Sequence, residues 1–156
     1  MLLRVQDNTD CRLEQVRTLF TEYAASLGVD LGFQDFEAEL AGLPGAYVPP
    51  DGVLLLALVA DQAAGCVALR RLDDTTCEMK RLYVRPAYRG AGLGKQLAKA
   101  IIAEARTIGY RAMRLDSLPS MLGAVQLYRS LGFQEIDPYR YNPIPGSIFL
   151  EISLEK

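Results

Sequence analysis

LYVRPAYRGAGLGK, at residues 82–95, is the stretch that decides the fold, because a strand pattern ends in it and a helix pattern begins. Three glycines, at positions 90, 92 and 94, let the backbone turn tightly and approach a ligand without interference from a Cβ atom. The apolar spacing that follows predicts a helix ending at Gly109. Its first N–H groups and its positive dipole end would face the turn. We therefore expect a phosphate cradle, to which Arg89 and Lys95 add charge.

Two common nucleotide-binding signatures do not fit this turn. The triphosphate-binding loop GxxxxGK[ST] fails, because Arg89 stands five residues before Gly94 and Gln96 follows Lys95. The dinucleotide pattern GxGxxG starting at Gly90 fails as well, since Lys95 occupies its last glycine position. Asp116 could still bind a ribose hydroxyl, so an enzyme that uses a nicotinamide dinucleotide remains a weaker alternative.

The strand before the turn, Cys77–Val84, changes its alternation midway. Cys77 and Met79 share one phase, whereas Leu82 and Val84 share the other. A strand of this kind has two apolar faces or contains a bulge, and we predict a bulge near Lys80 and Arg81. A bulge leaves backbone N–H and C=O groups free for a ligand.

Around this centre, hydrophobic periodicity and turn residues predict one domain over residues 1–156. The expected helices cover residues 13–27, with Thr9 or Asp10 as the cap, a short segment with Phe33, Phe36 and Leu40, and a segment after Ser117 or Ser120 that reaches Leu131. The other expected strands are Leu2–Gln6, Val53–Ala60, Gly65–Leu72, Arg111–Asp116, Phe133–Ile136 and Ser147–Leu154. Two proline-rich loops, 43–52 with an exposed Tyr47 and 137–146, complete the chain.

Composition restricts the chemistry. The chain of 156 residues has no histidine, which excludes Ser-His triads and disfavours zinc and haem sites, so no metal is expected. Cys11, Cys66 and Cys77 lack the CxxC spacing and are expected to be small buried hydrophobic residues. The longest apolar run, Val53–Ala60, is far shorter than the ~20 residues of a membrane span. With no apolar leader after Met1, the sequence predicts a cytoplasmic protein that does not enter a membrane.

Charge is divided along the chain. Residues 18–69 contain seven acidic residues and no cation, whereas residues 79–114 contain nine cations and one acid, Glu104. The formal net charge is −2, which argues against nucleic-acid binding. The division suggests a polyanion held on one side and a cation on the other.

The pattern Arg-x-x-Gly-x-Gly at residues 89–94, after a strand ending at Val84, resembles the GNAT superfamily of acetyl-CoA-dependent N-acetyltransferases. The stretch AVQLYRSLGF at residues 124–133 resembles the second motif of that family. The expected order of elements also fits over nearly the whole chain. The resemblance implies an α/β fold of the α+β type. Its mixed, mostly antiparallel sheet would have about seven strands, helices on both faces, and a splay between the fourth and fifth strands.

The resemblance also implies the acetyl-CoA site. The cradle would bind the pyrophosphate of coenzyme A, and the backbone of the bulged strand would pair with the pantetheine arm as an added strand does. The implied residues are Leu82, Tyr83, Val84, Arg89, Gly90, Ala91, Gly92, Leu93, Gly94 and Lys95. Met121 replaces an asparagine that is frequent in the family, which removes one polar contact to the arm. Members of the family are often dimers, so the resemblance is compatible with a homodimer.

Transfer to an amine needs a base, and without histidine the candidates are carboxylates. The resemblance implies that Glu78 is the general base, with Asp116 as the alternative base. It also implies that Tyr128 is the acid that protonates the thiolate. A backbone N–H near Leu82 would stabilise the oxyanion. The acceptor, a small-molecule or peptide amine, is expected to be cationic and to contact Tyr23, Glu37, Tyr47, Asp116 and Tyr141. A non-catalytic acyl-CoA-binding module is the alternative of another class.

Overall fold

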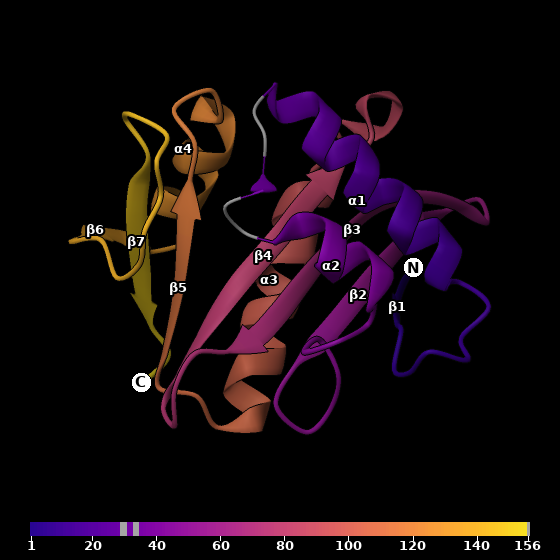
Figure 1. Cartoon of the computed structure of the whole chain (residues 1–156), viewed down its shortest axis with the longest axis horizontal. Helices are drawn as coiled ribbons and strands as arrows, with labels where there is room; N and C mark the ends of the chain where they lie inside the picture. The colour runs from indigo at the N-terminus through magenta and orange to yellow at the C-terminus, as the bar shows by residue number, and fades with distance from the viewer. Residues whose placement is uncertain (29–30, 33–34, 156) are drawn as a thin grey trace.

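The computed structural model describes residues 1–28, 31–32 and 35–155, and it contains a seven-stranded sheet (Figure 1). The strand order is β1-β2-β3-β4-β5-β7-β6, and among the described strands only β4 and β5 pair in parallel. This confirms the mixed, mostly antiparallel sheet that the family resemblance implies. The strands are β1 (Leu2–Arg4), β2 (Val53–Val59), β3 (Gln62–Arg71), β4 (Thr76–Val84), β5 (Ala112–Ser117), β6 (Gln134–Ile136) and β7 (Ile148–Ser153).

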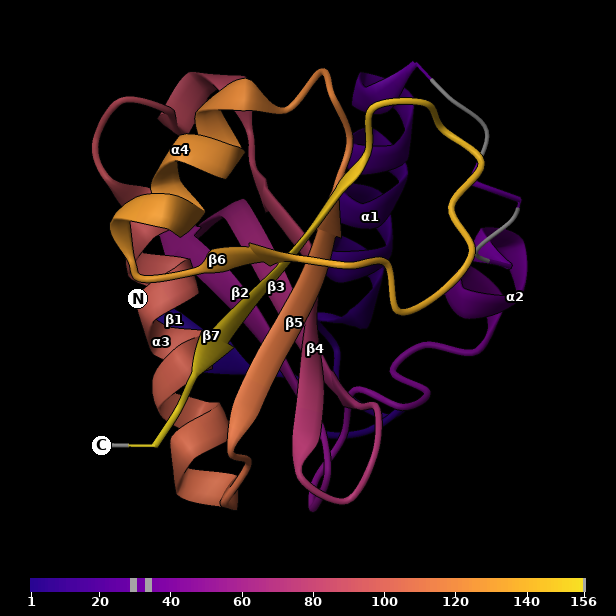
Figure 2. The ribbon, with the colours of Figure 1, turned by 90° about the vertical axis from the view of Figure 1, so that its left-hand side faces the viewer.

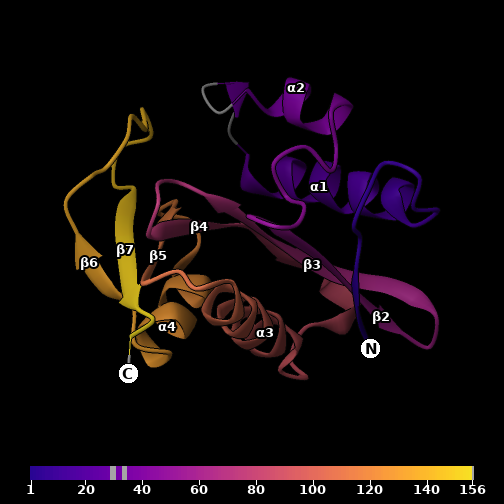
Figure 3. The same ribbon diagram turned by 90° about the horizontal axis from the view of Figure 1, so that it is seen from below.

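Helices cover both faces of the sheet (Figure 3). Helices α1 (Leu13–Leu27) and α2 (Phe36–Ala41) lie on one face, and α3 (Leu93–Ile108) and α4 (Leu122–Ser130) lie on the other. Alternate residues of β2 and β3 point to opposite faces and therefore enter two separate cores. Leu54 and Leu56 pack with α1, whereas Leu55 and Val67 pack with α3.

Strand β4 contains the predicted bulge. Cys66 pairs with Tyr83, but Ala68 pairs with Lys80, so Val67 of β3 stands opposite two residues of β4. Arg81 has a φ of 60°, a left-handed conformation that few residues other than glycine adopt. The bulge lies where the alternation of the sequence changes phase.

The sheet opens beyond the middle of β4. Strand β4 pairs with β5 only from Thr76 to Glu78, opposite Ala112 to Arg114, although both strands continue further. Figure 1 shows the two strands diverging from this point. The predicted splay between the fourth and fifth strands is therefore present, and the second half of β4 has no backbone partner on that side among the described strands.

The two predicted helix caps are wrong. Helix α1 begins one residue after Arg12, which has no capping side-chain bond, while Asp10 Oδ1 accepts the N–H of Arg12 at 2.8 Å. Helix α4 begins after Met121, and Ser117 lies inside β5. A polar residue near a helix start predicts a cap only loosely, because tight turns offer the same residue other backbone partners.

Two expectations about burial are also wrong. Tyr47 is only 4% exposed, because its ring packs edge-on against Phe20 at 6.2 Å between centroids. Cys11 is exposed ahead of α1, while Cys66 and Cys77 are buried as expected. Phe36 is a core residue as expected, and Phe33 lies outside the described residues. Among the described residues, no helix is both long and apolar enough to span a bilayer.

Candidate active site

A groove of about 620 Å³ runs along the open side of β4, past the glycine turn to α4. Its wall contains Leu82, Tyr83, Val84, Arg89, Gly90, Gly92, Leu93 and Gly94, which are eight of the ten residues expected to bind acetyl-CoA. Ala91 and Lys95 are exposed on the turn and are not part of this wall. Helix α4 supplies the opposite side through Ala124 and Leu127, preceded by Met121.

The glycine turn has the geometry of an anion cradle. Gly90 and Gly92 have φ angles of +90° and +82°, and a Cβ atom on either would meet nothing within 4 Å, so their backbone faces open space. The N–H of Gln96 donates to the carbonyl of Gly92 at 3.0 Å. The preceding N–H groups of residues 93–95 therefore lie at the open end of α3, where they can bind a diphosphate.

Arg89 adds a contact that the sequence did not predict. Its Nε donates to the carbonyl of Val84 at 2.8 Å, and its guanidinium lies 5.8 Å from the centre of the Tyr83 ring. The carbonyl of Val84 is one of the groups expected to pair with a pantetheine arm. Such an arm would compete with Arg89 for this carbonyl, which would release the guanidinium toward the phosphates.

A smaller, more enclosed pocket of about 30 Å³ continues the groove between β4 and β5. The two share Tyr23, Leu27, Leu82 and Met121, so they are contiguous. We call this second space the inner pocket. Lys80 and Arg81 of β4, Asp116 and Ser117 of β5, and Tyr128 of α4 line it. The bulge and the splay thus bring polar side chains to the point where the open strand begins.

Tyr128 lines the inner pocket and is only 5% exposed. Its ring packs against Phe133, with 5.6 Å between the centroids. Burial raises the pKa of Tyr128 above its usual value of 10. The phenol is therefore protonated at neutral pH and can act as a donor.

Glu78 is fully buried, and both of its oxygens have donors. Oε1 accepts from Arg70 Nε at 2.8 Å, and Oε2 accepts from the Tyr139 hydroxyl at 2.6 Å and lies 3.1 Å from a terminal nitrogen of Arg140. The ammonium of Lys80 lies 3.9 Å from Oε1. Glu78 is not part of the wall of the inner pocket, so it can reach an amine only through another group.

Asp116, by contrast, lines the inner pocket. Arg140 donates to its Oδ1 at 2.7 Å, and the Asn142 amide donates to its Oδ2 at 3.0 Å. These donors come from the loop between β6 and β7, which lies on the same face of the sheet as α1 and α2 (Figures 2 and 3). The sequence gives Tyr139 and Asn142 as polar loop residues, but nothing in it pairs Arg140 with Asp116.

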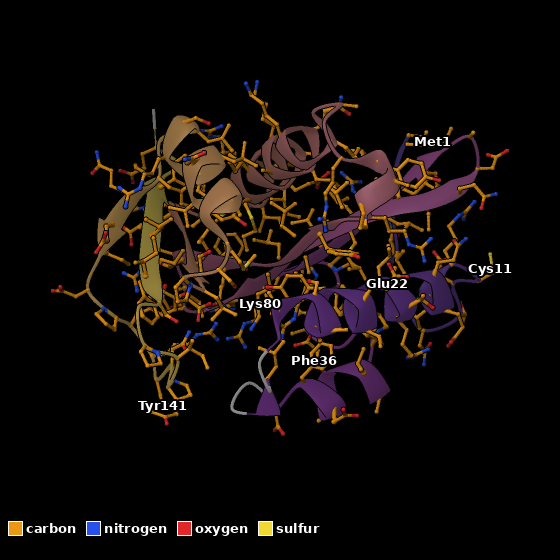
Figure 4. The ribbon with its side chains drawn as sticks, turned by 90° about the horizontal axis from the view of Figure 1, so that it is seen from above. Met1, Cys11, Glu22, Phe36, Lys80 and Tyr141 are labelled. Atoms are coloured by element: carbon orange, nitrogen blue, oxygen red, sulfur yellow. The ribbon has the colours of Figure 1, made fainter. Side chains whose placement is uncertain are left out.

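The residues expected to contact the acceptor are dispersed. Tyr23 lines both spaces, as Asp116 lines the inner one, but Tyr141 is 75% exposed and projects outward (Figure 4). Tyr47 lines a different cavity, of about 310 Å³, together with Glu39 and Arg70. Glu37 is exposed on α2 and lines none of these spaces. Residues two apart on a helix point in different directions, which is why Glu39 rather than Glu37 contacts Arg81 of β4.

The acidic segment, residues 18–69, does not give the inner pocket a negative wall. Glu39 forms two hydrogen bonds with Arg81, at 2.8 and 2.9 Å, and Glu22 does the same with Arg85 at 2.8 and 3.0 Å. Burial works to raise the pKa of Glu39, but Arg81 outweighs it and leaves that pKa below normal. These carboxylates neutralise the guanidinium groups of Arg81 and Arg85, so they are not available to hold a cationic acceptor.

An open bulged strand, a glycine cradle at a helix start and a buried phenol between them define an acyl-CoA-binding transferase site. The chain belongs to the Acetyltransferase (GNAT) family, which it matches over residues 13–133. An uncharacterised N-acetyltransferase of Schizosaccharomyces pombe is 42% identical over 146 residues, covering 92% of this chain and 90% of that protein. The chain is accordingly an acyltransferase of the N-acetyltransferase type, which sets aside the dinucleotide alternative.

Solved structures agree with this assignment. A GNAT-family acetyltransferase from Staphylococcus aureus superposes with a TM-score of 0.80 at 20% identity, covering 99% of this chain and 100% of that one, and so supports the fold. A GNAT-family acetyltransferase from Elizabethkingia anophelis, solved with acetyl-CoA bound, is 27% identical with a TM-score of 0.58. The match covers 66% of this chain and 76% of that one.

Proposed function

We propose that this protein transfers the acetyl group of acetyl-CoA directly to a primary amine. The observation that carries the proposal is the combination of bulge and splay, which frees the backbone of β4 beside the glycine cradle. The pyrophosphate would bind the turn at residues 89–95, and the pantetheine arm would lie along Leu82–Val84. The thioester would then enter the inner pocket, next to Tyr128.

The chemical step requires a neutral amine, a stabilised oxyanion and a protonated leaving group. The amine would attack the thioester carbonyl carbon, and a backbone N–H near Leu82 would stabilise the oxygen as it gains charge. The C–S bond then breaks, and Tyr128 donates its proton to the thiolate. Holding amine and thioester together supplies most of the acceleration, up to about 7–11 kcal/mol in well-oriented systems.

Two carboxylates compete for the role of base. Asp116 lines the inner pocket, whereas Glu78 is buried behind it and would need a relay through Lys80 or Tyr139. This placement favours Asp116 as the nearer acceptor of the amine proton. Glu78 would then be a positioning residue that holds Arg140 and Lys80.

The test has two stages. Calorimetry first measures acetyl-CoA binding, which the proposal requires, and release of free CoA thiol then measures transfer to a panel of amines. Asp116→Asn is expected to lower kcat about 10²-fold while acetyl-CoA still binds. Loss of the acidic limb of the pH profile, the fall in rate toward low pH, in Asp116→Asn but not in Glu78→Gln would assign the base to Asp116. Absence of any heat with acetyl-CoA would refute the function.

A further inference from the structure

We propose that the acceptor amine carries a carboxylate, and that Ser117 and Arg140 bind this carboxylate at the inner pocket. The inference rests on the proposed function, because it names the acceptor class of the same site. It replaces the cationic acceptor that the charge pattern of the sequence suggests. Three observations support it: an unpartnered hydroxyl, an unpartnered guanidinium nitrogen and the positive surroundings of the pocket.

Ser117 supplies the first observation. Its side chain lines the inner pocket, the residue is only 3% exposed, and its Oγ has no hydrogen-bond partner within the described ranges. Buried hydroxyl groups are nearly always hydrogen-bonded, because burial without a partner costs about 1–3 kcal/mol. A hydroxyl left in this state at the wall of a pocket is ready to donate to a ligand oxygen.

Arg140 supplies the second observation. One of its terminal nitrogens contacts both Glu78 and Asp116, but its Nε is buried with no partner in the described part of the chain. Arginine presents its donors in a fixed planar fork that matches the two oxygens of a carboxylate. Arg140 is not part of the wall of the inner pocket, but it is bonded to Asp116, which lines that pocket with Ser117. Its buried Nε can therefore donate to a ligand oxygen that enters beside Asp116.

The charge around the pocket supplies the third observation. Arg81 is neutralised by Glu39, and Glu78 is shared between Arg70, Lys80 and Arg140. Burial and the charges of Arg81, Arg140 and Arg70 together lower the pKa of Lys80 to about 7, against the opposing effect of Glu78. Lys80, a residue of β4 labelled in Figure 4, contacts Glu78 and is mostly charged only below a pH of about 7. Asp116 adds a carboxylate to the wall and is paired with Arg140. The four cations of this cluster therefore exceed its three carboxylates by one when Lys80 is protonated, and this excess favours a carboxylate over a diamine.

The enclosed form of the inner pocket sets the size of the acceptor. A carboxylate held by Ser117 and Arg140 must lie within a few bonds of an amine that faces the thioester. A free amino acid meets this requirement directly, and the N-terminus of a peptide does not, because its nearest carboxylate is an amide. We therefore assign the carboxylate to a free amino acid, and the test includes peptides as a separate arm.

The experiment compares matched acceptors with the full-length protein saturated with acetyl-CoA. Amino acids, their carboxamides, dipeptides and aliphatic diamines are assayed by thiol release, with each rate corrected for the fraction of neutral amine. Amino acids are expected to have kcat/KM values at least about tenfold above those of their own amides. Equal or higher values for amides, dipeptides or diamines would overturn the proposal.

Variants separate binding from structure. Ser117→Ala is expected to raise KM for the preferred amino acid roughly tenfold, with little change for its amide, for acetyl-CoA or in kcat. Arg140→Lys keeps the charge but loses the Nε donor, and it should raise KM for the amino acid but not for its amide. Because Arg140 also donates to Asp116, its kcat is expected to fall equally for both acceptors. Arg111→Gln, at the other end of β5 and 71% exposed at the side chain, is the control and should behave like the wild type. An equal loss for acid and amide would assign Ser117 a structural role.

A binding arm keeps the inference testable if no transfer is detected. Thermal unfolding is measured with CoA present, and an N-acetylated amino acid is compared with its carboxamide. A rise in Tm with the acid alone supports the carboxylate site even where the proposed transfer fails. No rise with either compound overturns the carboxylate site, whatever the outcome of the acetyl-CoA titration.

Discussion

The acetyl-CoA groove and the inner pocket are built in opposite ways. The groove uses backbone groups from one continuous stretch, residues 82–94, in which glycines remove side-chain bulk. The cluster behind the inner pocket uses charged side chains from β3, β4, β5 and the β6–β7 loop, brought together around Glu78. Recognition by backbone depends on local sequence, whereas recognition by side chains depends on the whole topology. The two halves of the site can therefore be damaged separately.

Glu78→Gln is expected to give the largest difference between the two regions, because it should lower stability without changing acetyl-CoA affinity. Removing this buried carboxylate leaves Arg70, Lys80 and Arg140 without their shared partner, so the free energy of unfolding should fall by about 3–5 kcal/mol. Acetyl-CoA affinity should remain that of the wild type, because the groove is untouched. Urea denaturation and calorimetry measure the two quantities.

Glu135→Gln is the matched control, since the side chain of Glu135 is 58% exposed and pairs with Arg129. A pair of this kind contributes at most about 1 kcal/mol. Unchanged stability in Glu78→Gln together with lost turnover would instead identify Glu78 as the base.

Tyr128→Phe acts at the junction of the two regions. Loss of the phenol is expected to lower kcat about 10²-fold, because the thiolate would leave without a proton donor. Stability and acetyl-CoA affinity should change little, since the ring still packs against Phe133. Steady-state kinetics with Tyr141→Phe as the exposed control measures the effect. A wild-type kcat in Tyr128→Phe would contradict the assigned role.

Lys80→Met tests the charged cluster through pH. The pKa of Lys80 is about 7 in the folded chain, below the ~10.4 of an unfolded lysine, so the unfolded state binds more protons between these values. The stability of the wild type should consequently rise with pH across this window. Between pH 7 and pH 9 it should gain about 2 kcal/mol relative to Lys80→Met. Parallel stability curves for the two proteins, measured by urea denaturation, would exclude the lowered pKa.

Gly92→Ala gives the smallest effect and tests the groove alone. At a φ of +82° an alanine is strained by about 1–2 kcal/mol, and relaxation of the turn should weaken acetyl-CoA binding about tenfold. Gly28→Ala is the control, because Gly28 has a φ of +67° and equally open surroundings at the end of α1. Both variants should lose similar stability, but only Gly92→Ala should lose affinity. Equal affinities would show that the turn does not hold the diphosphate.

The same contrast explains what the sequence could predict. The glycine turn, the helix that follows and the bulge near Arg81 each depend on residues that are close together in the sequence, and all three are present. The position of Asp116 in the pocket follows from its place at the end of a strand. The contacts of Arg140 with Glu78 and Asp116 join residues 62 and 24 positions apart, counted from their residue numbers, and depend on how a loop folds back over the sheet. Periodicity carries no information about such contacts.

The acidic segment shows the limit most clearly. Its excess of carboxylates is real, but Glu22 and Glu39 meet Arg85 and Arg81 from the basic segment across the interface between α1, α2 and β4. Net charge along a chain does not reveal which charges are paired after folding. Only the paired structure shows that the inner pocket faces Lys80, Arg81 and Asp116.

The short parallel contact between β4 and β5 has a mechanical consequence. Three residue pairs, from Thr76 to Glu78, are the only backbone ladder between the half-sheet β1–β4 and the half-sheet β5–β7 in the described chain. The ladder therefore acts as a pivot, about which the two halves can rock while each keeps its own hydrogen bonds. Acetyl-CoA bound between the diverging ends of β4 and β5 would hold the two half-sheets in a fixed orientation. Its binding should therefore slow amide hydrogen exchange even in strands that it does not contact.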